Sequence, residues 1–288
     1  MPAITIPAPA KINLSLHVCG KRADGYHLLD SLVVFAGVGD VITVAPADTL
    51  TLAITGPFGA ALSTESDNLV LRAARLLAET HKITAGATIT LEKNLPVASG
   101  IGGGSADAAA TLKACAKLWG VKLKGLSNQT IATKLGADVP VCLKGLPAFM
   151  SGIGEIVAPA PALPEAWLVL ANPGVPLATR AVFEALRGRS SEPMERGRFA
   201  GLTSVWALSQ ALGLTRNDLT LPATKLQPVI GTVIKGLQGT GAMIARMCGS
   251  GPTCFGLFAE EAAAQRAAKS LATLNPGWWT AAAPILKG

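Results

Sequence analysis

The chain has 288 residues, 50% of them hydrophobic and 15% charged, and it carries a formal net charge of +7 at pH 7. The composition excludes a disordered chain, and the length predicts one or two domains because a single hydrophobic core stops growing near roughly 250 residues. No stretch without a charged residue exceeds 17 residues, and one of the two that reach this length, 270–286, is interrupted by two prolines and a glycine, which excludes a bilayer-spanning helix of about 20 apolar residues there.

In chain order, β-strand patterns come first. Alternation of apolar and polar residues predicts strands at 10–18, 40–45 and 50–55. The segment ESDN, 65–68, then supplies capping residues for an amphipathic helix that ends near residue 80. A further strand, 87–93, leads directly into a glycine-rich loop.

A helix follows the glycine-rich loop. Ser105 and Asp107 are expected to open it, and an apolar stripe runs along it at helical spacing, formed by Ala108, Leu112, Cys115 and Trp119. A short helix is predicted at 127–136. The next segment, ADVPVCL at 137–143, is expected to be a loop that turns into a strand, because Pro140 cannot lie inside a helix.

The second half of the chain begins after a stretch rich in Pro, Gly and Ala between 146 and 164. We place the lobe boundary there, which gives lobes at 1–155 and 156–288. The second lobe is predicted to contain a strand at 166–171, helices near 179–187, 203–213 and 222–238, two strands around the turn MCGSGPTCFGLF at 247–258, a helix at 260–274 and a final strand. Strands and helices mix without strict alternation, which favours an α+β fold over a doubly wound sheet.

The first residues and the charge pattern bear on location and partners. The opening MPAITIPAPAKINL has neither the basic nor the apolar region of a signal peptide, so we expect a cytoplasmic protein. Lys and Arg are spread thinly, without a basic run or interleaved aromatic residues, which favours an anionic small molecule in a concave site over a nucleic acid. No membrane partner is expected, and the sequence leaves the oligomeric state open.

Cysteine and histidine positions support neither a disulfide framework nor a metal site made by the protein alone. We interpret the cysteines as small apolar core residues and predict no metal ligand. The residues concerned are Cys19, Cys115, Cys142, Cys248 and Cys254, with His17, His27 and His81.

The segment GIGGGSADAAATL, 100–112, combines a bare backbone with a helix start. Glycines let backbone N–H groups approach an anion, and a helix start carries about half a unit of positive charge, so phosphate fits this environment. The alternative is a turn needed only for tight packing of a strand against a helix. Because each glycine costs roughly 0.5–1 kcal/mol relative to alanine, three in a row favour a ligand.

Known phosphate motifs narrow the choice. The chain has no GxxxxGK[ST] motif, which excludes a Walker P-loop. The dinucleotide fingerprint GxGxxG also fails, because Ser105 stands at its last glycine position and several strands precede it. A hydroxyl beside a polyphosphate can serve a metal or a phosphoryl oxygen, so Ser105 indicates a magnesium-bound nucleoside triphosphate.

Four segments resemble the GHMP small-molecule kinases, named for galactokinase, homoserine kinase, mevalonate kinase and phosphomevalonate kinase. LPVASGIGGGSADAA (95–109) is similar to the ATP loop of that superfamily. APAKINLSLHVCGKRADGYHLLDSL (8–32) and LGADVPVCLKG (135–145) resemble its branch that acts on a cytidine-diphosphate-linked methylerythritol. GSGPTCFGLF (249–258) extends the similarity toward the C-terminus.

The resemblance implies a two-lobe α+β fold, with an N-terminal lobe like domain 2 of ribosomal protein S5, a C-terminal α/β sandwich lobe and an active site in the cleft between them. It implies ATP-dependent transfer of the γ-phosphoryl group to the 2-hydroxyl of the methylerythritol moiety. This is a step of the non-mevalonate (MEP) route of isoprenoid and terpenoid biosynthesis. The small-molecule substrate carries a cytidine diphosphate group as its handle.

The resemblance also implies two catalytic residues. Asp138 matches the catalytic aspartate, a carboxylate that accepts the proton of the attacking hydroxyl; taken alone, its alternative is a structural residue that ends a helix. Lys11 matches the catalytic lysine, whose ammonium orients Asp138 and offsets charge in the transition state. The alternative for Lys11 is a solvated lysine at a strand start.

For the substrate, the resemblance assigns cytosine recognition to Tyr26, the only tyrosine, and to the adjacent His27. Phe183 corresponds to an aromatic residue on the other side of the base, and Thr179 to a residue near the substrate. Asn13 matches a polar contact on the same strand face as Lys11. The alternatives are a turn tyrosine, a surface histidine and a core phenylalanine.

For ATP, the resemblance assigns the loop residues Pro96, Val97, Ala98, Ser99, Gly100, Ile101, Gly102, Gly103, Gly104, Ser105 and Ala106. Asn68 and Lys93 match positions that line the base pocket; a helix cap and an exposed strand end are their alternatives. The second glycine turn, 249–251, is expected to close over the phosphates.

Two features qualify this assignment. The superfamily loop commonly carries further glycine in place of Ala98 and Ser99, so the first half of this loop is expected to be stiffer. Mg²⁺ is inferred from the nucleotide, because no acidic motif announces a dedicated ligand, and we expect phosphates and water to hold it.

Two other functions stay open at this point. Another GHMP kinase, acting on homoserine or mevalonate, would have no use for the segment RADGYH. A non-catalytic nucleotide-binding module would have no use for both Lys11 and Asp138.

Overall fold

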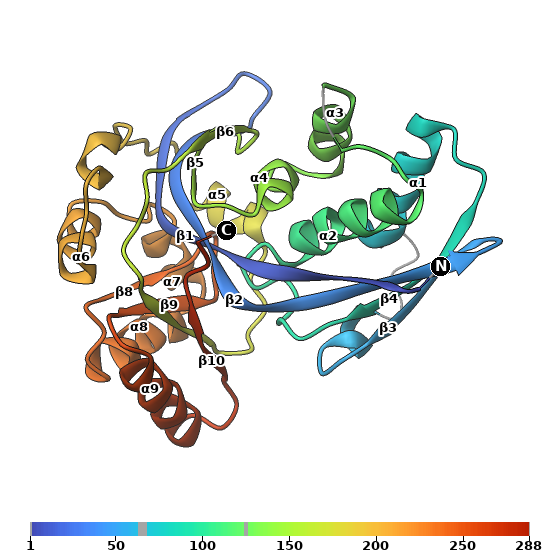
Figure 1. The fold of residues 1–288 in the computed structure, drawn as a ribbon. Coiled ribbons are helices and arrows are strands. Elements are labelled where there is room, and N and C mark those ends of the chain that lie inside the picture. The colour runs from blue at the N-terminus through green and yellow to red at the C-terminus, as the bar shows by residue number, and fades with distance from the viewer. Residues whose placement is uncertain (1, 63–67, 124–125, 288) are drawn as a thin grey trace. The chain divides into compact units, whose positions relative to one another are not determined.

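The computed structural model describes residues 2–62, 68–123 and 126–287 (Figure 1). The chain forms two compact units that interleave along the sequence. The first unit contains Met1–Ala10, Gly39–Val97 and Gly102–Gly145, and the second contains Lys11–Val38, Ala98–Ile101 and Leu146–Gly288. Strands β1 (Ile4–Lys21) and β2 (His27–Ala47) contribute residues to both units. The lobe boundary placed at 155 and 156 stays a prediction.

In the first unit, β2 pairs antiparallel with β4 (Gly86–Glu92), and β3 (Leu50–Thr55) pairs parallel with β4. Ala87, Ile89 and Leu91 of β4 are buried while Thr88 and Glu92 are exposed, so the strand has one core face. Helices α1 (Leu69–His81) and α2 (Gly103–Leu118) lie on one side of these strands in Figure 1.

Three shorter helices complete the first unit, namely η1 (Gly59–Leu62), α3 (Leu126–Leu135) and α4 (Val139–Lys144). Helix α2 packs against α1, α3 and α4. Most of its residues are buried, and the many alanines among them permit this close packing on several sides. The start of α2 is thereby held in a fixed position within this unit.

The second unit contains an antiparallel sheet in the order β10-β7-β9-β8. Its strands are β7 (Trp167–Asn172), β8 (Ile244–Met247), β9 (Cys254–Phe258) and β10 (Trp279–Pro284). Helices α8 (Val229–Gly239) and α9 (Glu261–Leu274) pack on this sheet.

In the same unit, β2 pairs antiparallel with β5 (Ala148–Gly152), which pairs with β6 (Ile156–Pro159). The remaining elements are α5 (Thr179–Glu184), η2 (Arg196–Phe199), α6 (Val205–Gly213) and α7 (Thr220–Leu226). The mixture of mainly antiparallel sheets and helices confirms the predicted α+β class.

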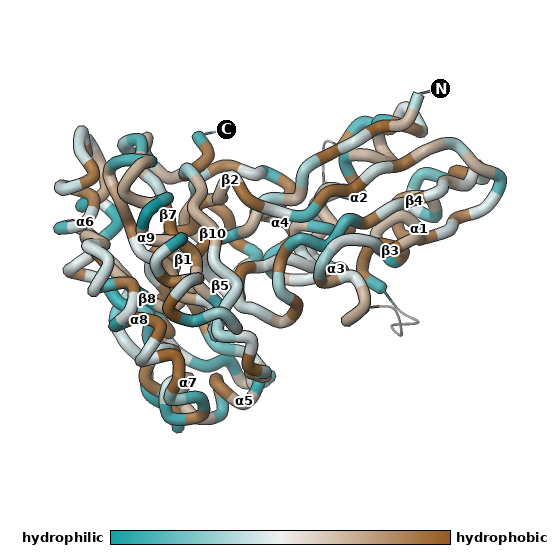
Figure 2. Tube along the Cα trace, turned by 90° about the horizontal axis from the view of Figure 1, so that it is seen from below, coloured by the Kyte–Doolittle hydropathy of each residue, from teal (hydrophilic) through white to brown (hydrophobic). Residues whose placement is uncertain are grey.

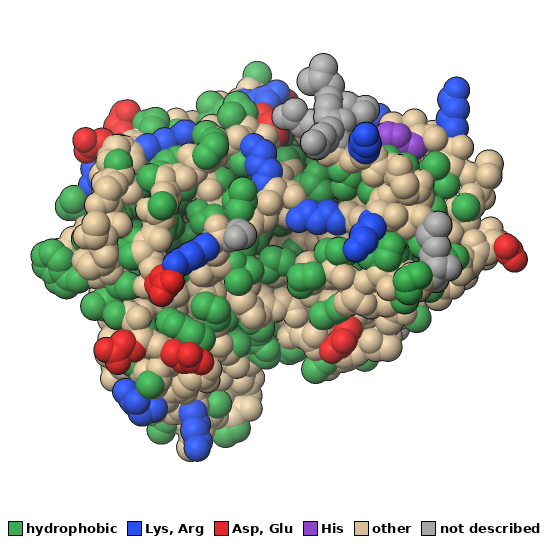
Figure 3. Space-filling model, viewed as in Figure 1, with side chains coloured by type: hydrophobic (Ala, Val, Ile, Leu, Met, Phe, Trp, Pro, Cys, Tyr) green, Lys and Arg blue, Asp and Glu red, His purple; other side chains and the backbone are tan. Residues whose placement is uncertain are grey.

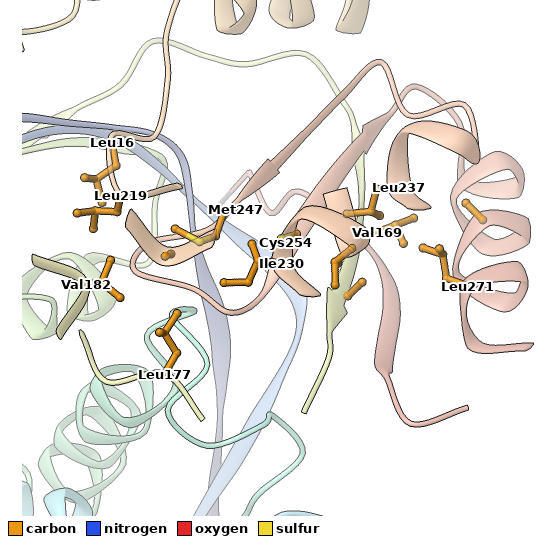
Figure 4. Packing of buried hydrophobic residues seen from close by; sticks show 14 of the residues in the cluster. Leu16, Val169, Leu177, Val182, Leu219, Ile230, Leu237, Met247, Cys254 and Leu271 are labelled. Atoms are coloured by element: carbon orange, nitrogen blue, oxygen red, sulfur yellow. The ribbon is translucent and has the colours of Figure 1, made fainter. Parts of the chain in front are cut away.

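The core of the second unit lies between this sheet and its helices. Val169, Leu237 and Leu271 meet where β7, α8 and α9 pack together (Figure 4). Helix α9 carries both hydrophilic and hydrophobic residues along its length (Figure 2). Its buried residues recur at helical spacing, so one face enters the core and the other stays in water.

Most predicted elements are confirmed, but three predictions were wrong. The segment 137–143 does not become a strand: α4 begins at Val139, with Pro140 in its first turn. A proline is tolerated there because the N–H that it lacks would have no partner inside the helix. The predicted helix 222–238 is two helices, α7 and α8, since a residue before a proline, here Gln227 before Pro228, is disfavoured in helical conformation. Helix α2 is opened by Gly102, and not by Ser105 and Asp107.

Strands β5, β6 and the first half of β2 were not predicted, and the capping residues expected at 65–67 lie outside the described residues. Among the residues that the structure describes, no helix is long and apolar enough to cross a bilayer. On the face in Figure 3, Lys and Arg side chains are scattered over the surface, and some of them lie beside Asp or Glu side chains.

Candidate active site

The start of α2 in the first unit presents free backbone donors. Gly102 precedes the helix in left-handed conformation, with φ of 66°, and no described side chain caps the helix. The N–H of Ala106 bonds to Gly102 O at 2.9 Å, which leaves the N–H groups of the three preceding helical residues without an intrahelical acceptor. Among the described residues, a Cβ added at Gly104 would meet only Leu69 Cδ2, at 4.0 Å. The helix start is therefore open to an anion.

Two other predicted residues belong to elements that begin beside this helix start. Asn68 caps α1 by accepting the N–H of Val70 at 2.9 Å, and the next residue, Leu69, faces Gly104. A Cβ added at Gly136 would lie 3.9 Å from Ser105 Oγ, so the turn before α4 adjoins the start of α2. Asp138 follows in that turn.

Asp138 occupies the N-cap position of α4, and its side chain does not cap that helix in the described part of the chain. The residue is half-buried. Its backbone carbonyl accepts the N–H of Cys142 at 3.1 Å, which fixes the backbone at this position. Its role as a catalytic base stays a prediction, and so does the alternative of a structural residue that ends a helix.

Lys93 is buried, contrary to the alternative of an exposed strand end. Its Nζ donates to Asp40 Oδ2, and at 2.8 Å to Asp107 Oδ2. These three residues, which we call the buried ion triad, are 3%, 1% and 2% exposed for Lys93, Asp40 and Asp107. Sequence reasoning missed this triad. An Asp or Lys at the end of a buried strand could have indicated an ion pair, because charged residues are seldom buried unpaired.

The pKa values of the triad follow from burial and mutual charge. Burial raises the pKa of Asp107 to about 7, with Asp40 adding to the rise and Lys93 opposing it. Asp107 Oδ1 has no hydrogen-bond partner among the described residues, which also disfavours the ionised carboxylate. For Lys93, burial alone would lower the pKa, yet the two carboxylates together raise it above its ordinary value.

In the second unit, the first half of the glycine loop packs on the second glycine turn. A Cβ at Gly100 would lie 2.6 Å from Gly251 O, and one at Gly249 would lie 2.5 Å from Gly100 O. The N–H of Thr253 donates to Ser99 O at 3.2 Å. Gly100 and Gly249 permit backbone to pack directly on backbone. The alternative explanation of the glycines, a turn needed for tight packing, therefore applies to the first half of the glycine-rich loop.

Lys11 and Asn13 lie beside this packed pair of turns. The N–H of Lys11 donates to Ile101 O at 2.9 Å, and the N–H of Asn13 approaches Cys248 Sγ at 3.2 Å. Both side chains are buried. Asn13 Nδ2 donates to Ser31 Oγ at 2.7 Å, while Asn13 Oδ1 has no partner among the described residues. Because an unpaired buried acceptor is costly, Asn13 is suited to receive a ligand donor.

The predicted base-recognition residues also come together in the second unit. The rings of His27 and Phe183 stack, with centroids 4.9 Å apart and planes 26° apart, and Tyr26 beside them is 60% exposed. Burial, and then Lys21, lower the pKa of His27, which favours a neutral imidazole that can both donate and accept a hydrogen bond. Thr179 Oγ1 lies 2.8 Å from Ser250 Oγ of the second glycine turn. Ser250 was not predicted individually.

No group of three or more His, Cys, Asp or Glu side chains that could hold a metal occurs among the described residues. The described residues therefore suit Mg²⁺ as an ion that arrives with a nucleotide, because Mg²⁺ keeps several waters and binds substrate phosphates. The triphosphate itself fits the open start of α2. Lys11 belongs to the second unit and Asp138 to the first.

Family models match both halves of the chain. The GHMP kinases N terminal domain matches residues 68–146, and the GHMP kinases C terminal domain matches residues 203–276. A 4-diphosphocytidyl-2-C-methyl-D-erythritol kinase of Paramagnetospirillum magneticum is 52% identical, covering 99% of this chain and 100% of the relative. The kinase of the same name from Cereibacter sphaeroides strain KD131 is 56% identical, covering 97% of this chain and 98% of the relative.

Solved structures give the same picture. A crystal structure of 4-(cytidine 5'-diphospho)-2C-methyl-D-erythritol kinase matches with a TM-score of 0.82 and 32% identity, covering 99% of this chain and 100% of that one. A homoserine kinase from Cytophaga hutchinsonii matches with a TM-score of 0.75 and 20% identity over 100% of this chain and 96% of that one, which is a likeness of fold. The chain therefore belongs to the GHMP kinases and, within them, to the family of 4-diphosphocytidyl-2-C-methyl-D-erythritol kinases.

Proposed function

We propose that this chain transfers the γ-phosphoryl group of ATP to the 2-hydroxyl of 4-diphosphocytidyl-2-C-methyl-D-erythritol, with Asp138 and Lys11 as catalytic residues. The products are the 2-phosphate and ADP. The reaction is a step of the MEP route to isoprenoid precursors, and the cytoplasm is its expected location. The substrate is a small molecule that carries a cytidine diphosphate group.

The observation that carries the proposal is the open start of α2. Gly102 directs the chain into a helix whose first N–H groups are uncapped, beside the turn that holds Asp138. Phosphoryl transfer needs donors on the phosphates and a base at the acceptor, and little covalent chemistry from the protein. The uncapped N–H groups and the neighbouring carboxylate of Asp138, both in the first unit, support the proposal.

Asp138 is proposed to accept the proton of the 2-hydroxyl as that oxygen attacks phosphorus. A positioned base contributes about 10²- to 10⁴-fold to the rate. Lys11 is proposed to stabilise the negative charge that develops on the acceptor oxygen. Its burial favours this role, because an ammonium acts more strongly where water is excluded.

The remaining predicted residues serve binding. Tyr26, His27 and Phe183 offer aromatic faces and an imidazole edge for cytosine, and Asn13 offers its unpaired Oδ1 to a donor on the substrate. Ser105 stands at the third position of α2, where its N–H and hydroxyl suit a phosphate oxygen. When bound with ATP, Mg²⁺ supplies neutralisation of phosphate charge.

The test of function is ADP release by the purified protein with three acceptors. We expect ADP release with 4-diphosphocytidyl-2-C-methyl-D-erythritol, and none above background with homoserine or mevalonate. Turnover with either of the other alcohols would favour another GHMP kinase. ATP binding without ADP release from any acceptor would favour a non-catalytic nucleotide-binding module.

The test of mechanism is Asp138→Asn, which keeps the shape of the side chain and removes the base. We expect kcat to fall about 10²- to 10⁴-fold while the KM for ATP changes little. Asp48→Asn, at an exposed aspartate of the same unit, is the matched control and should leave kcat unchanged. Unchanged turnover in Asp138→Asn would remove the base assignment.

Lys11→Met tests the second catalytic residue. If both groups serve one step, the double variant with Asp138→Asn should lose much less than the product of the two single losses, because residues that act as a unit are not additive. Fully multiplicative losses would assign Lys11 to a different step.

A further inference from the structure

The buried ion triad holds the start of the glycine-rich loop, which is proposed to bind phosphate. Asp40 Oδ1 accepts the N–H groups of Asn94 at 2.6 Å and Leu95 at 2.8 Å, the first residues after Lys93. The other oxygen of Asp40 accepts from Lys93 Nζ. The carboxylate of Asp40 thereby fixes both the backbone that begins the loop and the ammonium beside it.

The triad also holds the exit of the loop. Asp107 lies in α2, one turn after Gly103, and accepts from Lys93 Nζ at 2.8 Å. A Cβ added at Gly103 would lie 3.1 Å from Lys93 Nζ and 3.7 Å from Asp40 Oδ2, so the first residue of α2 rests directly on the ion pairs. A side chain at this position would require Lys93 Nζ or the helix start to shift by a few tenths of an ångström.

Lys93 is itself fixed by its backbone. Its N–H donates to Thr55 O at 2.8 Å, and its carbonyl accepts the N–H of Phe58 at 3.1 Å. Only 3% of the residue is exposed, and its charge is already shared between two carboxylates. An ammonium in this state is better suited to hold protein groups in place than to bind a ligand directly.

We propose that Lys93, Asp40 and Asp107 are positioning residues for the nucleotide, joining residues 94–95 to the first turns of α2 so that the N–H groups of α2 face the triphosphate. This inference rests on the proposed function, because it assumes that ATP binds at the start of α2. It changes the role expected for Lys93, which acts through Asp107 and not on the adenine base.

The experiment compares Lys93→Met and Asp107→Leu, which remove ion pairs, with Asp107→Asn, which keeps an oxygen acceptor for Lys93. Lys113→Met is the control, because Lys113 is a partly buried lysine on the same helix that lies beside Gly145. For each variant we would measure the KM for ATP, the KM for the cytidine diphosphate substrate, kcat, and the inhibition constant of inorganic tripolyphosphate. Tripolyphosphate is a probe with phosphates and no base.

Asp107→Asn is expected to fold well at pH 8. The folded pKa of Asp107 is raised to about 7 from 3.8, so the native state is most favoured while this group is protonated. That stabilisation decreases as the pH rises from about 4 to about 7, because the unfolded chain releases its proton first. The amide avoids the cost of an ionised carboxylate above this range.

Lys93→Met and Asp107→Leu should raise the KM for ATP and the inhibition constant of tripolyphosphate by the same factor. We expect a factor of about five to ten, which lies in the usual range of affinity changes caused by a group that does not touch the ligand. The KM for the other substrate should change less than about twofold, which is below that range. Asp107→Asn should restore nearly native values, and Lys113→Met should keep them.

Two outcomes would overturn the inference. If Lys93→Met raised the KM for ATP but left tripolyphosphate inhibition unchanged, Lys93 would bind the base directly. If all constants shifted together in the triad variants and in Lys113→Met, the triad would only stabilise the fold. Failure of the proposed function is distinguishable, because then the native protein itself would release no ADP with the cytidine diphosphate substrate.

Discussion

The glycines of the glycine-rich loop and of the turn at 249–251 form two groups that are needed for different physical reasons. At Gly100, Gly249 and Gly251, an added Cβ would fall within 2.6 Å of another part of the protein. At Gly104 an added Cβ would meet only one described atom, at 4.0 Å. Gly100 and Gly249 are bare because backbone packs against them, and Gly251 because the side chain of Met247 does. Gly104 is bare where the described protein leaves room.

The difference separates stability from binding. A glycine whose missing side chain makes space for the protein is needed for folding, and its replacement should lower the free energy of unfolding. A glycine whose missing side chain makes space for a ligand costs stability in the free protein, so its replacement should weaken binding while stability stays unchanged or rises. Sequence composition cannot distinguish the two, because both groups read as glycine-rich turns.

The largest expected effect is that of Gly100→Ala on stability. Gly100 has φ of 77°, and its Cβ would lie 2.6 Å from Gly251 O, 2.8 Å from Gly251 N and 2.9 Å from Cys248 O. Backbone atoms cannot move aside easily, so overpacking adds about 1–3 kcal/mol to a left-handed penalty of about 1–2 kcal/mol. We expect the free energy of unfolding in urea to fall by about 3 kcal/mol.

Gly201→Ala is the matched control for Gly100→Ala. Gly201 has φ of 69°, and no described atom lies within 4 Å of its added Cβ. It carries the conformational penalty without the clash, so a loss of only about 1 kcal/mol is expected. Equal losses at the two positions would show that backbone conformation, and not packing of the two turns, requires glycine at 100.

The next effect is that of Gly104→Ala on nucleotide binding. Gly104 is the second residue of α2, where alanine should leave stability unchanged or raise it by about 0.5 kcal/mol. The methyl group would enter the space proposed for phosphate and cost about one hydrogen bond to a charged group, worth roughly 1.5–3 kcal/mol. We expect the KM for ATP to rise about tenfold or more, measured by ADP release.

Gly213→Ala in α6 provides the comparison for Gly104→Ala, because no described atom lies within 4 Å of its added Cβ. It should leave the KM for ATP unchanged. A loss of stability in Gly104→Ala without a change in KM would contradict the division between the two groups of glycines.

The sequence predicted elements that depend on local pattern. Helix α1 follows from amphipathic spacing, and β3 from alternation, with bounds that agree at 50–55. The first half of β2 was missed because 32–36 is buried at every residue, so the segment shows no alternation. Helix α4 was missed because Pro140 was taken to exclude a helix, although a proline is suited to the first turn.

The parts of the site that depend on distant contacts could not be predicted in this way. Asp40 lies opposite Lys93 because β2 and β4 pair antiparallel with Val41 facing Glu92, a register that neither strand specifies alone. The packing of Gly100 on Gly251 joins segments about 150 residues apart in the same manner. Residue roles carried by the family resemblance, including Lys11 and Asp138, stay predictions until the variants are measured.

The smallest expected effect is that of Ala98→Gly, at the position where the loop departs from the glycine common in its superfamily. Ala98 has φ of 51°, a left-handed conformation that costs an alanine about 1–2 kcal/mol. Glycine relieves this strain but loses more entropy on folding, so the free energy of unfolding should rise by about 0.5–1 kcal/mol.

The predicted stiffness of this half of the loop determines what Ala98→Gly does to binding. Ser99 O is held by the Thr253 N–H at 3.2 Å and Ile101 O by the Lys11 N–H at 2.9 Å, so the segment after residue 98 stays anchored when residue 98 becomes flexible. We therefore expect the KM for ATP to stay unchanged. Lys82→Gly relieves a similar φ of 55° at the end of α1 and controls for stability gained elsewhere. If Ala98→Gly raised the KM for ATP and Lys82→Gly did not, the strained alanine itself would help to shape the loop for the nucleotide. The half of the loop that belongs to the second unit would then, like Gly104, be needed for binding.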